Sequence, residues 1–297
     1  MKAIVLAGGK GTRLWPLTAG YSKQLLPVYD KPMIHYSLAT AMHAGIREIL
    51  IVTSAEFLSM YKNQLGDGKN LGIEISYAAQ AAPNGIAEGL LIGEEFLDGS
   101  KVLYILGDNI FHGASLGGAL RDYTDVTGAQ IFGYKVSNAR SYGVVEVSEN
   151  GQTLSIEEKP VNPRSNLAIP GLYFFDESAV DLAKKIEPSN RGELEITDLL
   201  LQYMKVGKLQ TRVLPRGTVW LDAGTPLDLQ RASSYVQIVE ERQGLKIGCL
   251  EEISYLNGWL DDNQILAILT NMPECDYKQY LKRIFQLGKK ISPKFKF

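Results

Sequence analysis

The feature that most constrains the fold is an apolar run at the start of the chain that leads directly into glycines. Residues 3–7 read AIVLA, which is the length and composition of a buried strand. Gly8, Gly9 and Gly11 follow, with Arg13 close behind them. Glycine lets the backbone turn with positive φ and bring N–H groups close to phosphate oxygens, and arginine can donate two hydrogen bonds to one phosphate. The stretch therefore predicts a strand that ends at an anion-binding loop.

The spacing of these glycines fits neither of the two commonest phosphate-binding motifs. The dinucleotide fingerprint Gly-x-Gly-x-x-Gly, counted from Gly9, would need a glycine where Leu14 stands. The P-loop would need serine or threonine directly after Lys10, where Gly11 stands. A strand-to-loop turn that binds no ligand stays open from the residues alone, because glycine is common after strands.

The composition is that of an ordinary globular protein of 297 residues. The 31 Lys and Arg against 33 Asp and Glu give a formal net charge of -2, so nothing indicates a nucleic-acid partner or an anionic membrane partner. No apolar run approaches membrane-spanning length. Two cysteines, Cys249 and Cys275, are too few for a disulfide framework. We therefore expect a cytoplasmic protein in which both cysteines are packing thiols.

Strand-like and helix-like stretches alternate through the first half of the chain. This alternation is typical of a doubly wound α/β sheet, in which ligands bind at the carboxyl ends of the strands. The spacing of apolar residues predicts a helix beyond Pro32, then strand 48–54, a helix around 57–65, strand 73–77, helix 86–97 and strand 101–106.

The second half departs from this alternation. Residues 142–147 and 153–157 flank a Glu149-Asn150-Gly151 turn, which predicts a β-hairpin. One strand is expected over 167–175 and one long helix over 226–243. Two or three amphipathic helices follow and carry no catalytic constellation of their own, so we expect a packing appendage.

Two carboxylates are expected at strand ends although they lie far apart in the sequence. Asp108 follows strand 101–106, and Asp222 follows the apolar residues 219–221. Mg²⁺ keeps one or two protein carboxylates and completes its shell with phosphate oxygens and water. The pair therefore fits a magnesium site. From the residues alone, the alternative that each aspartate merely caps a loop or helix stays open.

Several strings of residues together resemble a known family. Residues 6–18 (LAGGKGTRLWPLT) and 22–28 (SKQLLPV) resemble the signature of the sugar-1-phosphate nucleotidylyltransferases. The same family is matched by GDNIF at 107–111, EEKP at 157–160, RGELEITD at 191–198 and WLDAGT at 220–225. The tail is similar to the members that use dTTP, at 240–246 and 257–262.

The resemblance implies an α/β fold with a doubly wound mixed, mostly parallel, Rossmann-like nucleotidyltransferase sheet. An inserted β-hairpin region and a C-terminal helical appendage complete that fold. The resemblance places the catalytic domain at 1–245, with a nucleotide-binding part at about 1–110 and a sugar-phosphate-binding part at about 111–245. Residues 246–297 would form a helical segment used for oligomer or regulatory packing.

The resemblance also implies roles for individual residues. The catalytic residues would be Arg13, Lys23, Asp108, Lys159 and Asp222, and Mg²⁺ would bind Asp108 and Asp222. The nucleotide would be bound by Gly8, Gly9, Gly11, Thr12, Arg13, Lys23, Gln80, Gly85 and Asp108. The sugar phosphate would be bound by Asn109, Gly143, Glu158, Lys159, Ile169 and Arg191.

The implied reaction is in-line transfer of a thymidylyl group from dTTP to α-D-glucose 1-phosphate, with release of pyrophosphate. The resemblance further implies a homotetramer that catalyses the first step of dTDP-L-rhamnose or related deoxysugar synthesis. It also implies feedback inhibition by a dTDP-sugar at a second site, for which Arg216 is the candidate. Three alternatives stay open: UTP in place of dTTP, because Ala81 and residues 86–88 depart from the family pattern; another sugar 1-phosphate; and a non-catalytic subunit that binds sugar nucleotides.

Overall fold

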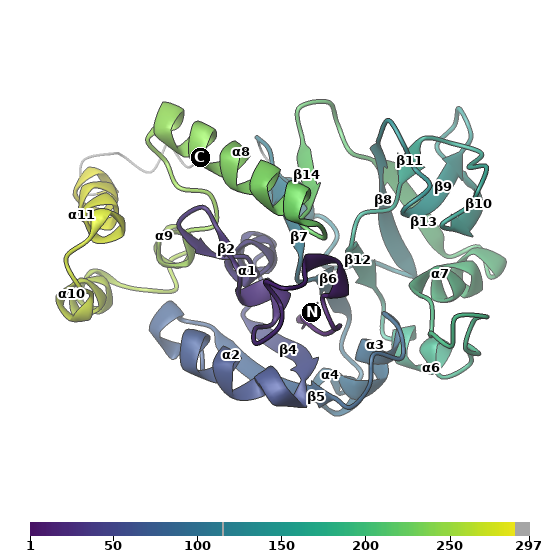
Figure 1. Cartoon of the computed structure of the whole chain (residues 1–297), viewed down its shortest axis with the longest axis horizontal. Coiled ribbons are helices and arrows are strands. Elements are labelled where there is room, and N and C mark those ends of the chain that lie inside the picture. The colour runs from purple at the N-terminus through teal and green to yellow at the C-terminus, as the bar shows by residue number, and fades with distance from the viewer. Residues whose placement is uncertain (115, 289–297) are drawn as a thin grey trace.

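The computed structural model describes residues 1–114 and 116–288. A mixed sheet of ten strands forms the centre of the fold (Figure 1). Its strands are β1 (Lys2–Leu6), β4 (Glu48–Ser54), β5 (Glu74–Gln80), β6 (Val102–Leu106), β8 (Ala129–Lys135), β9 (Gly143–Val147), β10 (Thr153–Glu158), β11 (Leu167–Ala168), β12 (Leu172–Phe175) and β13 (Leu209–Val213). The strand order is β10-β9-β11-β8-β12-β6-β1-β4-β5, and β13 pairs with β8. Strands β6, β1, β4 and β5 run parallel, whereas β12, β11, β9 and β10 pair antiparallel with their neighbours. The predicted mixed, mostly parallel sheet is confirmed, and its run of parallel strands lies at one end of the strand order.

Helices flank the sheet, and two short β-ribbons lie outside it. The helices are α1 (Ile34–His43), α2 (Leu58–Leu65), α3 (Glu88–Ile92), α4 (Glu94–Leu97), α5 (Leu116–Arg121), α6 (Ala179–Ala183), α7 (Ile196–Lys205), α8 (Pro226–Gln243), α9 (Leu250–Leu256), α10 (Asp262–Asn271) and α11 (Asp276–Gly288). The ribbons pair β2 (Pro27–Val28) with β3 (Lys31–Pro32) and β7 (Asn109–His112) with β14 (Val219–Asp222). In Figure 1, α10 and α11 lie at the opposite end of the molecule from the β9–β10 hairpin.

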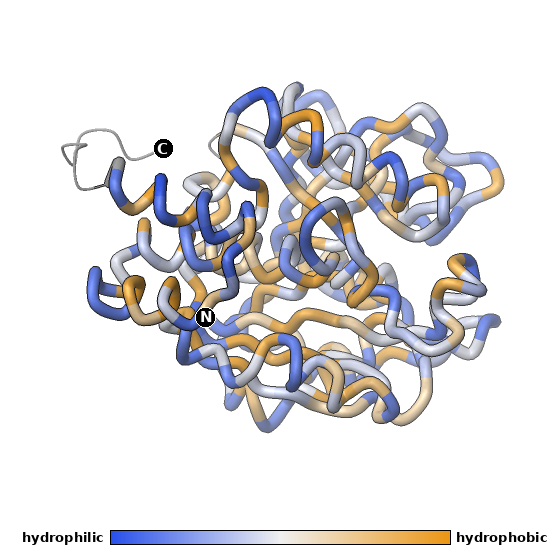
Figure 2. Tube along the Cα trace, turned by 60° about the vertical axis from the view of Figure 1, so that its left-hand side comes forward, coloured by the Kyte–Doolittle hydropathy of each residue, from blue (hydrophilic) through white to orange (hydrophobic). Residues whose placement is uncertain are grey.

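Both faces of the parallel strands are buried, which explains their nearly continuous apolar sequences. Val5 of β1 and Ile51 of β4 belong to the core that includes α1, whereas Ile4 and Leu50 belong to the core on the other face, with α3 and α7. Hydrophobic residues accordingly follow the central strands in Figure 2. None of the helices in the described part of the chain is long and apolar enough to cross a membrane.

Two predicted elements are broken in the structure. The helix expected over 86–97 is interrupted at Gly93, which packs against Ile4 so closely that a side chain there would collide with it. The strand expected over 167–175 is two strands, because β11 pairs with β8 and β9 whereas β12 pairs with β6 and β8. Pro170, which has no N–H to donate, lies between them. Strands β8 and β13 of the sheet were not predicted.

The C-terminal part agrees with prediction in its helices and differs in one cysteine. Helix α8 spans 226–243 as expected, because Thr225 caps it by accepting from the N–H of Asp228 at 3.2 Å and Gly244 ends it in the left-handed region. Cys249 is buried, but Cys275 is exposed, so the prediction of a packing role is wrong for Cys275.

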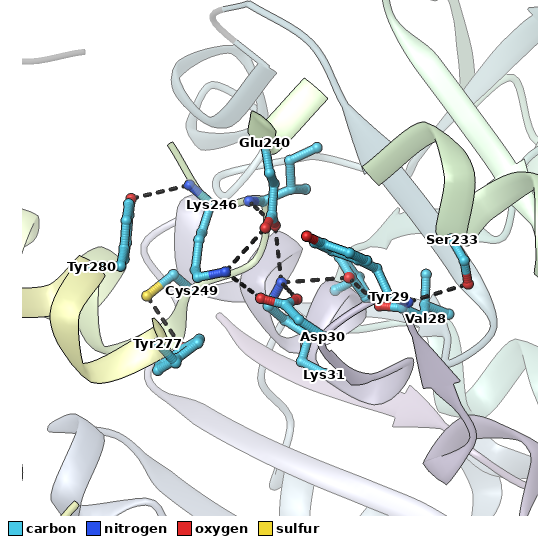
Figure 3. Close-up of polar contacts among 12 residues, drawn as sticks. Val28, Tyr29, Asp30, Lys31, Ser233, Glu240, Lys246, Cys249, Tyr277 and Tyr280 are labelled. Carbon is cyan, nitrogen blue, oxygen red and sulfur yellow. Dashed lines mark hydrogen bonds and ion pairs between the residues drawn. The ribbon is translucent and has the colours of Figure 1, made fainter. Parts of the chain in front are cut away.

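A buried charge cluster joins the β2–β3 hairpin to the end of α8 and to α11 (Figure 3). Lys31 Nζ lies 3.0 Å from Glu240 Oε1, and these side chains are 3% and 6% exposed. Lys246 Nζ lies 3.1 Å from Glu240 Oε2, and Asp30 pairs with both lysines. The backbone N–H of Lys246 donates to the hydroxyl of Tyr280 at 3.1 Å. The cluster therefore fixes the hairpin against residues about two hundred positions later in the chain.

Candidate active site

A cavity opens at the carboxyl ends of β1 and β6 and extends to the β9–β10 hairpin. Ten of the predicted site residues line it: Gly8, Arg13, Lys23, Asp108, Asn109, Gly143, Glu158, Lys159, Ile169 and Asp222. They come from segments spread over more than two hundred residues. The fold therefore brings the greater part of the predicted nucleotide and sugar-phosphate residues to one place.

The glycine loop follows β1 as predicted. Gly9 and Gly11 have φ values of +94° and +59°, which residues with a side chain rarely adopt. The amide of Gln24 donates to the carbonyl of Gly8 at 3.3 Å, so the loop is fixed from inside. Thr12 and Arg13 begin a short 3-10 helix, Thr12–Leu14, that directs the arginine to the cavity.

The two aspartates meet because β14 pairs with β7 in register. Asp222 is opposite Asn109, and the backbone N–H of Ala223 donates to the carbonyl of Asp108 at 3.2 Å. Asp108 follows β6 at the end of a central strand as expected. Asp222 is the last residue of β14, so its predicted place at a strand end is confirmed, although β14 pairs with β7 outside the ten-stranded sheet.

The electrostatics of the two carboxylates differ. Burial opposes ionisation of Asp108, but the ammonium of Lys23 and the amide of Asn109 outweigh it and hold the pKa of Asp108 below its usual value. Burial and the neighbouring charge of Asp108 raise the pKa of Asp222 to about 6, although Lys23 and Arg13 oppose that rise. A buried and a half-buried carboxylate that repel each other form a site that a cation would stabilise.

The donor set at this point suits Mg²⁺. Among residues 1–114 and 116–288, no group of three or more His, Cys, Asp or Glu could hold a metal ion. An ion here would therefore have Asp108 and Asp222 as protein ligands and would need phosphate oxygens or water for the rest of its shell. Hard oxygen ligands with at most two carboxylates are the set that Mg²⁺ takes together with a nucleotide.

The predicted sugar residues converge around Gly143, the first residue of β9. A β-carbon at Gly143 would lie 3.3 Å from Thr197 Cγ2, 3.5 Å from Glu158 Oε2 and 3.7 Å from Ile169 Cδ1. Space that only a glycine leaves open, beside a carboxylate and an aliphatic side chain, suits a sugar ring with its hydroxyls.

Lys159 and Arg191 supply positive charge beside Glu158. Lys159 has a φ of +42°, a backbone conformation that favours glycine, and its Nζ lies 3.1 Å from Glu158 Oε1. Arg191 does not line the cavity; its Nη2 lies 2.8 Å from both carboxylate oxygens of Glu195 and 3.6 Å from Glu158 Oε1. Glu195 is buried, so it fixes the guanidinium at the edge of the sugar side.

The predicted base-binding residues lie beside the glycine loop. Gln80 is the last residue of β5, and its Oε1 lies where a side chain on Gly8 would project. Gly85 has a φ of +115°, and a β-carbon there would collide with the backbone of Leu194. Neither Gln80 nor Gly85 lines the cavity itself, but Gly8 and Ile86 next to them do.

Both ends of the Asn109 side-chain amide bond to the protein. Its Nδ2 donates to Asp108 at 3.0 Å, and its Oδ1 accepts from the indole of Trp220 at 2.6 Å and from the N–H of Gly171 at 2.9 Å. Its amide therefore orients the carboxylate of Asp108, which is a different task from the predicted contact with the sugar phosphate.

Other residues line the cavity that sequence reasoning did not select. They include Tyr142, Tyr173, Thr197 and Trp220. The rings of Tyr142 and Trp220 meet edge to face with centroids 5.1 Å apart and form one wall. For three of them the sequence held a signal, because Tyr142 precedes Gly143 and both Thr197 and Trp220 lie within strings that match the family. No such signal marked Tyr173.

The nucleotidyl transferase family model matches residues 2–238 of this chain. The chain belongs to the nucleotidyl transferase family. It is 50% identical over 287 residues to a glucose-1-phosphate thymidylyltransferase of Neisseria meningitidis, and the match covers 96% of this chain and 100% of that one. The predicted family and enzyme class are confirmed.

Solved structures of this family share the fold. One from Bacillus anthracis, described as a glucose-1-phosphate thymidylyltransferase with sucrose, is 36% identical with a TM-score of 0.74, over 79% of this chain and 94% of that chain. A UDP-glucose pyrophosphorylase in complex with UDP-glucose is 25% identical with a TM-score of 0.71, over 80% and 98% of the two chains.

Proposed function

We propose that this chain transfers a thymidylyl group from dTTP to α-D-glucose 1-phosphate and releases pyrophosphate. The observation that carries the proposal is the convergence in one cavity of Arg13, Lys23 and Lys159 with the carboxylates of Asp108 and Asp222. Relatives that share about half of its residues carry the name of this activity. The reaction predicted from the sequence agrees with them, and it makes the chain a transferase of nucleotide-sugar synthesis.

The reaction needs positioning and charge stabilisation more than proton transfer. The attacking oxygen of a sugar 1-phosphate is already an anion, so no general base is required, and the two phosphate groups repel each other as they approach. Arg13 and Lys23 on the nucleotide side, with Lys159 and Arg191 on the sugar side, would offset that repulsion and stabilise charge in the transition state. Asp108 and Asp222 would hold Mg²⁺, whose charge stabilises negative charge on the phosphate oxygens.

Each side of the cavity has its own binding task in this proposal. The N–H groups of the glycine loop (Gly8, Gly9, Gly11 and Thr12) would bind the triphosphate, with Gln80 and Gly85 at the base. Glu158 would accept hydrogen bonds from sugar hydroxyls, while Gly143 and Ile169 shape the space for the ring. The predicted contact of Asn109 with the sugar phosphate would use the second N–H of its amide, since one N–H donates to Asp108.

The wider setting is also part of the proposal. Exposed apolar side chains such as Leu227 and Ile238 on α8 would be covered in a homotetramer, which is the assembly implied by the resemblance. A dTDP-sugar would inhibit the enzyme at a second site near the exposed Arg216, and the reaction would open a deoxysugar pathway in the cytoplasm. The boundary proposed at residue 245 falls between α8 and α9.

The experiment that tests the proposal is a substrate panel scored by pyrophosphate release. The purified chain is assayed with Mg²⁺, each nucleoside triphosphate and several sugar 1-phosphates, with and without dTDP-rhamnose. Highest kcat/KM with dTTP and glucose 1-phosphate supports the proposal, and inhibition by dTDP-rhamnose that excess dTTP does not relieve supports the second site. UTP is the second candidate, because the chain is similar to a UDP-glucose pyrophosphorylase. A preference for UTP would replace dTTP in the proposed reaction. Binding of the substrates without release of pyrophosphate would indicate a non-catalytic subunit.

A further inference from the structure

A carboxylate beside Gln80 fixes the direction in which its amide group faces. Gln80 is buried at the end of β5, and its Nε2 donates to Glu88 Oε2 at 2.7 Å and to the carbonyl of Gly85 at 3.5 Å. The other carboxylate oxygen of Glu88 accepts from Asn84 Nδ2 at 2.8 Å. Glu88 begins α3, so its backbone is held by the helix.

The chemistry of this pair assigns the two ends of the Gln80 amide. An ionised carboxylate accepts hydrogen bonds and donates none, so the NH₂ group of Gln80 must face Glu88 and its Oε1 must face the other way. Oε1 lies against the α-carbon of Gly8, where a β-carbon would collide with it, and Gly8 lines the cavity. Gln80 therefore turns its hydrogen-bond acceptor toward the glycine loop, beside the cavity.

Pyrimidine bases differ at the ring atom that an acceptor can distinguish. Thymine and uracil carry an N–H at N3, whereas N3 of cytosine is an acceptor with a lone pair. An acceptor that is held toward N3 attracts the first two bases and repels the third. An amide that could turn over would present its NH₂ group to cytosine instead and lose this discrimination.

We propose that Glu88 is a positioning residue for base selection, because it holds the Gln80 amide in the orientation that accepts thymine or uracil and rejects cytosine. This inference rests on the proposed function, since it requires Gln80 to meet the base. Glu88 acts through Gln80 and does not itself contact the nucleotide. This proposal predicts no discrimination between thymine and uracil, because both bases present the same N3–H.

The test compares kcat/KM for dTTP, dUTP and dCTP, each with glucose 1-phosphate and Mg²⁺, in the wild type, Glu88→Gln and Glu95→Gln. Glutamine at 88 can donate as well as accept, so the Gln80 amide is free to turn over, and the dTTP:dCTP ratio should fall roughly tenfold or more. The dTTP:dUTP ratio and the KM for glucose 1-phosphate should not change. Glu95 is exposed on α4, and Glu95→Gln removes the same charge without altering either ratio.

An unchanged dTTP:dCTP ratio in folded Glu88→Gln overturns the inference, and so does an equal loss of activity with all three triphosphates, which a merely structural role would give. Absence of turnover in the wild type would instead contradict the proposed function. Base selection is then measured as the ratios of the Kd values of dTDP, dUDP and dCDP by calorimetry. Failure of all three to bind overturns the inference as well. If Glu88→Gln does not fold, Asn84→Ala, which frees Glu88 to move, must lower the same ratio or the inference fails.

Discussion

Three long polar side chains of the predicted site each bond to a carboxylate before any substrate arrives. Lys23 pairs with Asp108, Arg191 makes a fork with Glu195, and Gln80 donates to Glu88. A free lysine, arginine or glutamine loses rotamer freedom when it binds a ligand, and a fixed partner removes part of that cost in advance. At the scale of the residue, the site is therefore preorganised by carboxylates as much as by its cations.

Replacing Asp108 by asparagine should lower turnover by two or more orders of magnitude. The change removes a carboxylate that fixes Lys23 and, in the proposed mechanism, binds Mg²⁺, and such a charge-stabilising contact is worth on the order of 3 kcal/mol. Pyrophosphate release at saturating Mg²⁺ measures it. Asp122→Asn, an exposed aspartate after α5, is the matched control and should leave turnover unchanged. Near-normal turnover in Asp108→Asn would contradict the assignment.

Gly143→Ala should weaken binding of the sugar phosphate selectively. The new methyl group would lie 3.3 Å from Thr197 Cγ2 and would fill space beside Glu158, so the KM for glucose 1-phosphate should rise roughly tenfold. The KM for dTTP should stay the same. Steady-state kinetics with each substrate varied in turn provides the measurement, and Gly118→Ala, where no atom lies within 4 Å of the new group, is the control. An equal rise in both KM values would argue against a sugar site here.

At the scale of the element, the β2–β3 hairpin depends on the buried charge cluster with Glu240 and Lys246. The hairpin follows the 3-10 turn Lys23–Leu25, so its position also affects Lys23. Burying lysine and carboxylate groups costs solvation energy, which is recovered when each charge has a partner. Four charges of alternating sign meet this condition, which explains how charged residues persist in the interior.

Glu240→Ala should lower the free energy of unfolding by about 3–5 kcal/mol, because it leaves Lys31 and Lys246 short of a buried partner. Chemical denaturation monitored by circular dichroism gives the value. The neighbouring Glu241 is exposed and bonds to Gln237 within the helix, so Glu241→Ala should change stability by less than about 0.5 kcal/mol. Similar small effects for both variants would mean that the cluster contributes little.

Asp30 should make the stability depend on pH in the acid range. Burial raises the pKa of Asp30, but hydrogen bonds from Lys246 and Lys31 outweigh it, so the pKa lies below its usual value. A carboxylate with a lowered pKa stabilises the fold above its unfolded pKa of about 4 and loses that contribution as the pH falls through the folded value. Urea unfolding from pH 7 to pH 3 should therefore show a steeper loss in the wild type than in Asp30→Asn. Parallel curves would exclude this linkage.

At the scale of the whole molecule, the two halves of the chain meet at the pair of aspartates. Asp108 follows a strand of the parallel sheet, and Asp222 ends a strand of the separate β7–β14 ribbon. A cation between them would be bound only when both halves are folded together. The nucleotide would complete its ligands, so metal and nucleotide should bind cooperatively.

Removal of divalent metal should therefore abolish turnover and also weaken the stabilisation by nucleotide. After dialysis against EDTA, dTTP should raise the Tm less than it does with Mg²⁺ present, because RT ln(1 + [L]/Kd) falls as Kd rises. Added Mg²⁺ should restore both the Tm shift and pyrophosphate release. Ca²⁺ and Na⁺ at equal ionic strength serve as controls. Full activity in EDTA would exclude a metal at Asp108 and Asp222.

The sequence by itself determined the local features: the glycine loop after β1, the successive strand–helix units, the β9–β10 hairpin and α8 with its caps. Each depends on residues close together in the chain, which periodicity, turn chemistry and short matched strings can report. It also named the ten residues that the fold gathers in the cavity. Two of its errors, the broken helix at Gly93 and the two strands predicted as one, arose where packing or pairing with a distant strand overrides the local pattern.

Tertiary structure decided how the distant parts meet. The pairing of β14 with β7 places Asp222 beside Asp108 and raises its pKa, and no periodicity in either segment encodes that pairing. The pairing of Lys31 with Glu240 was likewise not visible in the sequence, because these residues lie 209 positions apart and meet only after the chain has folded. The sequence fixes which groups are available for chemistry, and long-range strand pairing and burial decide which of them share a site.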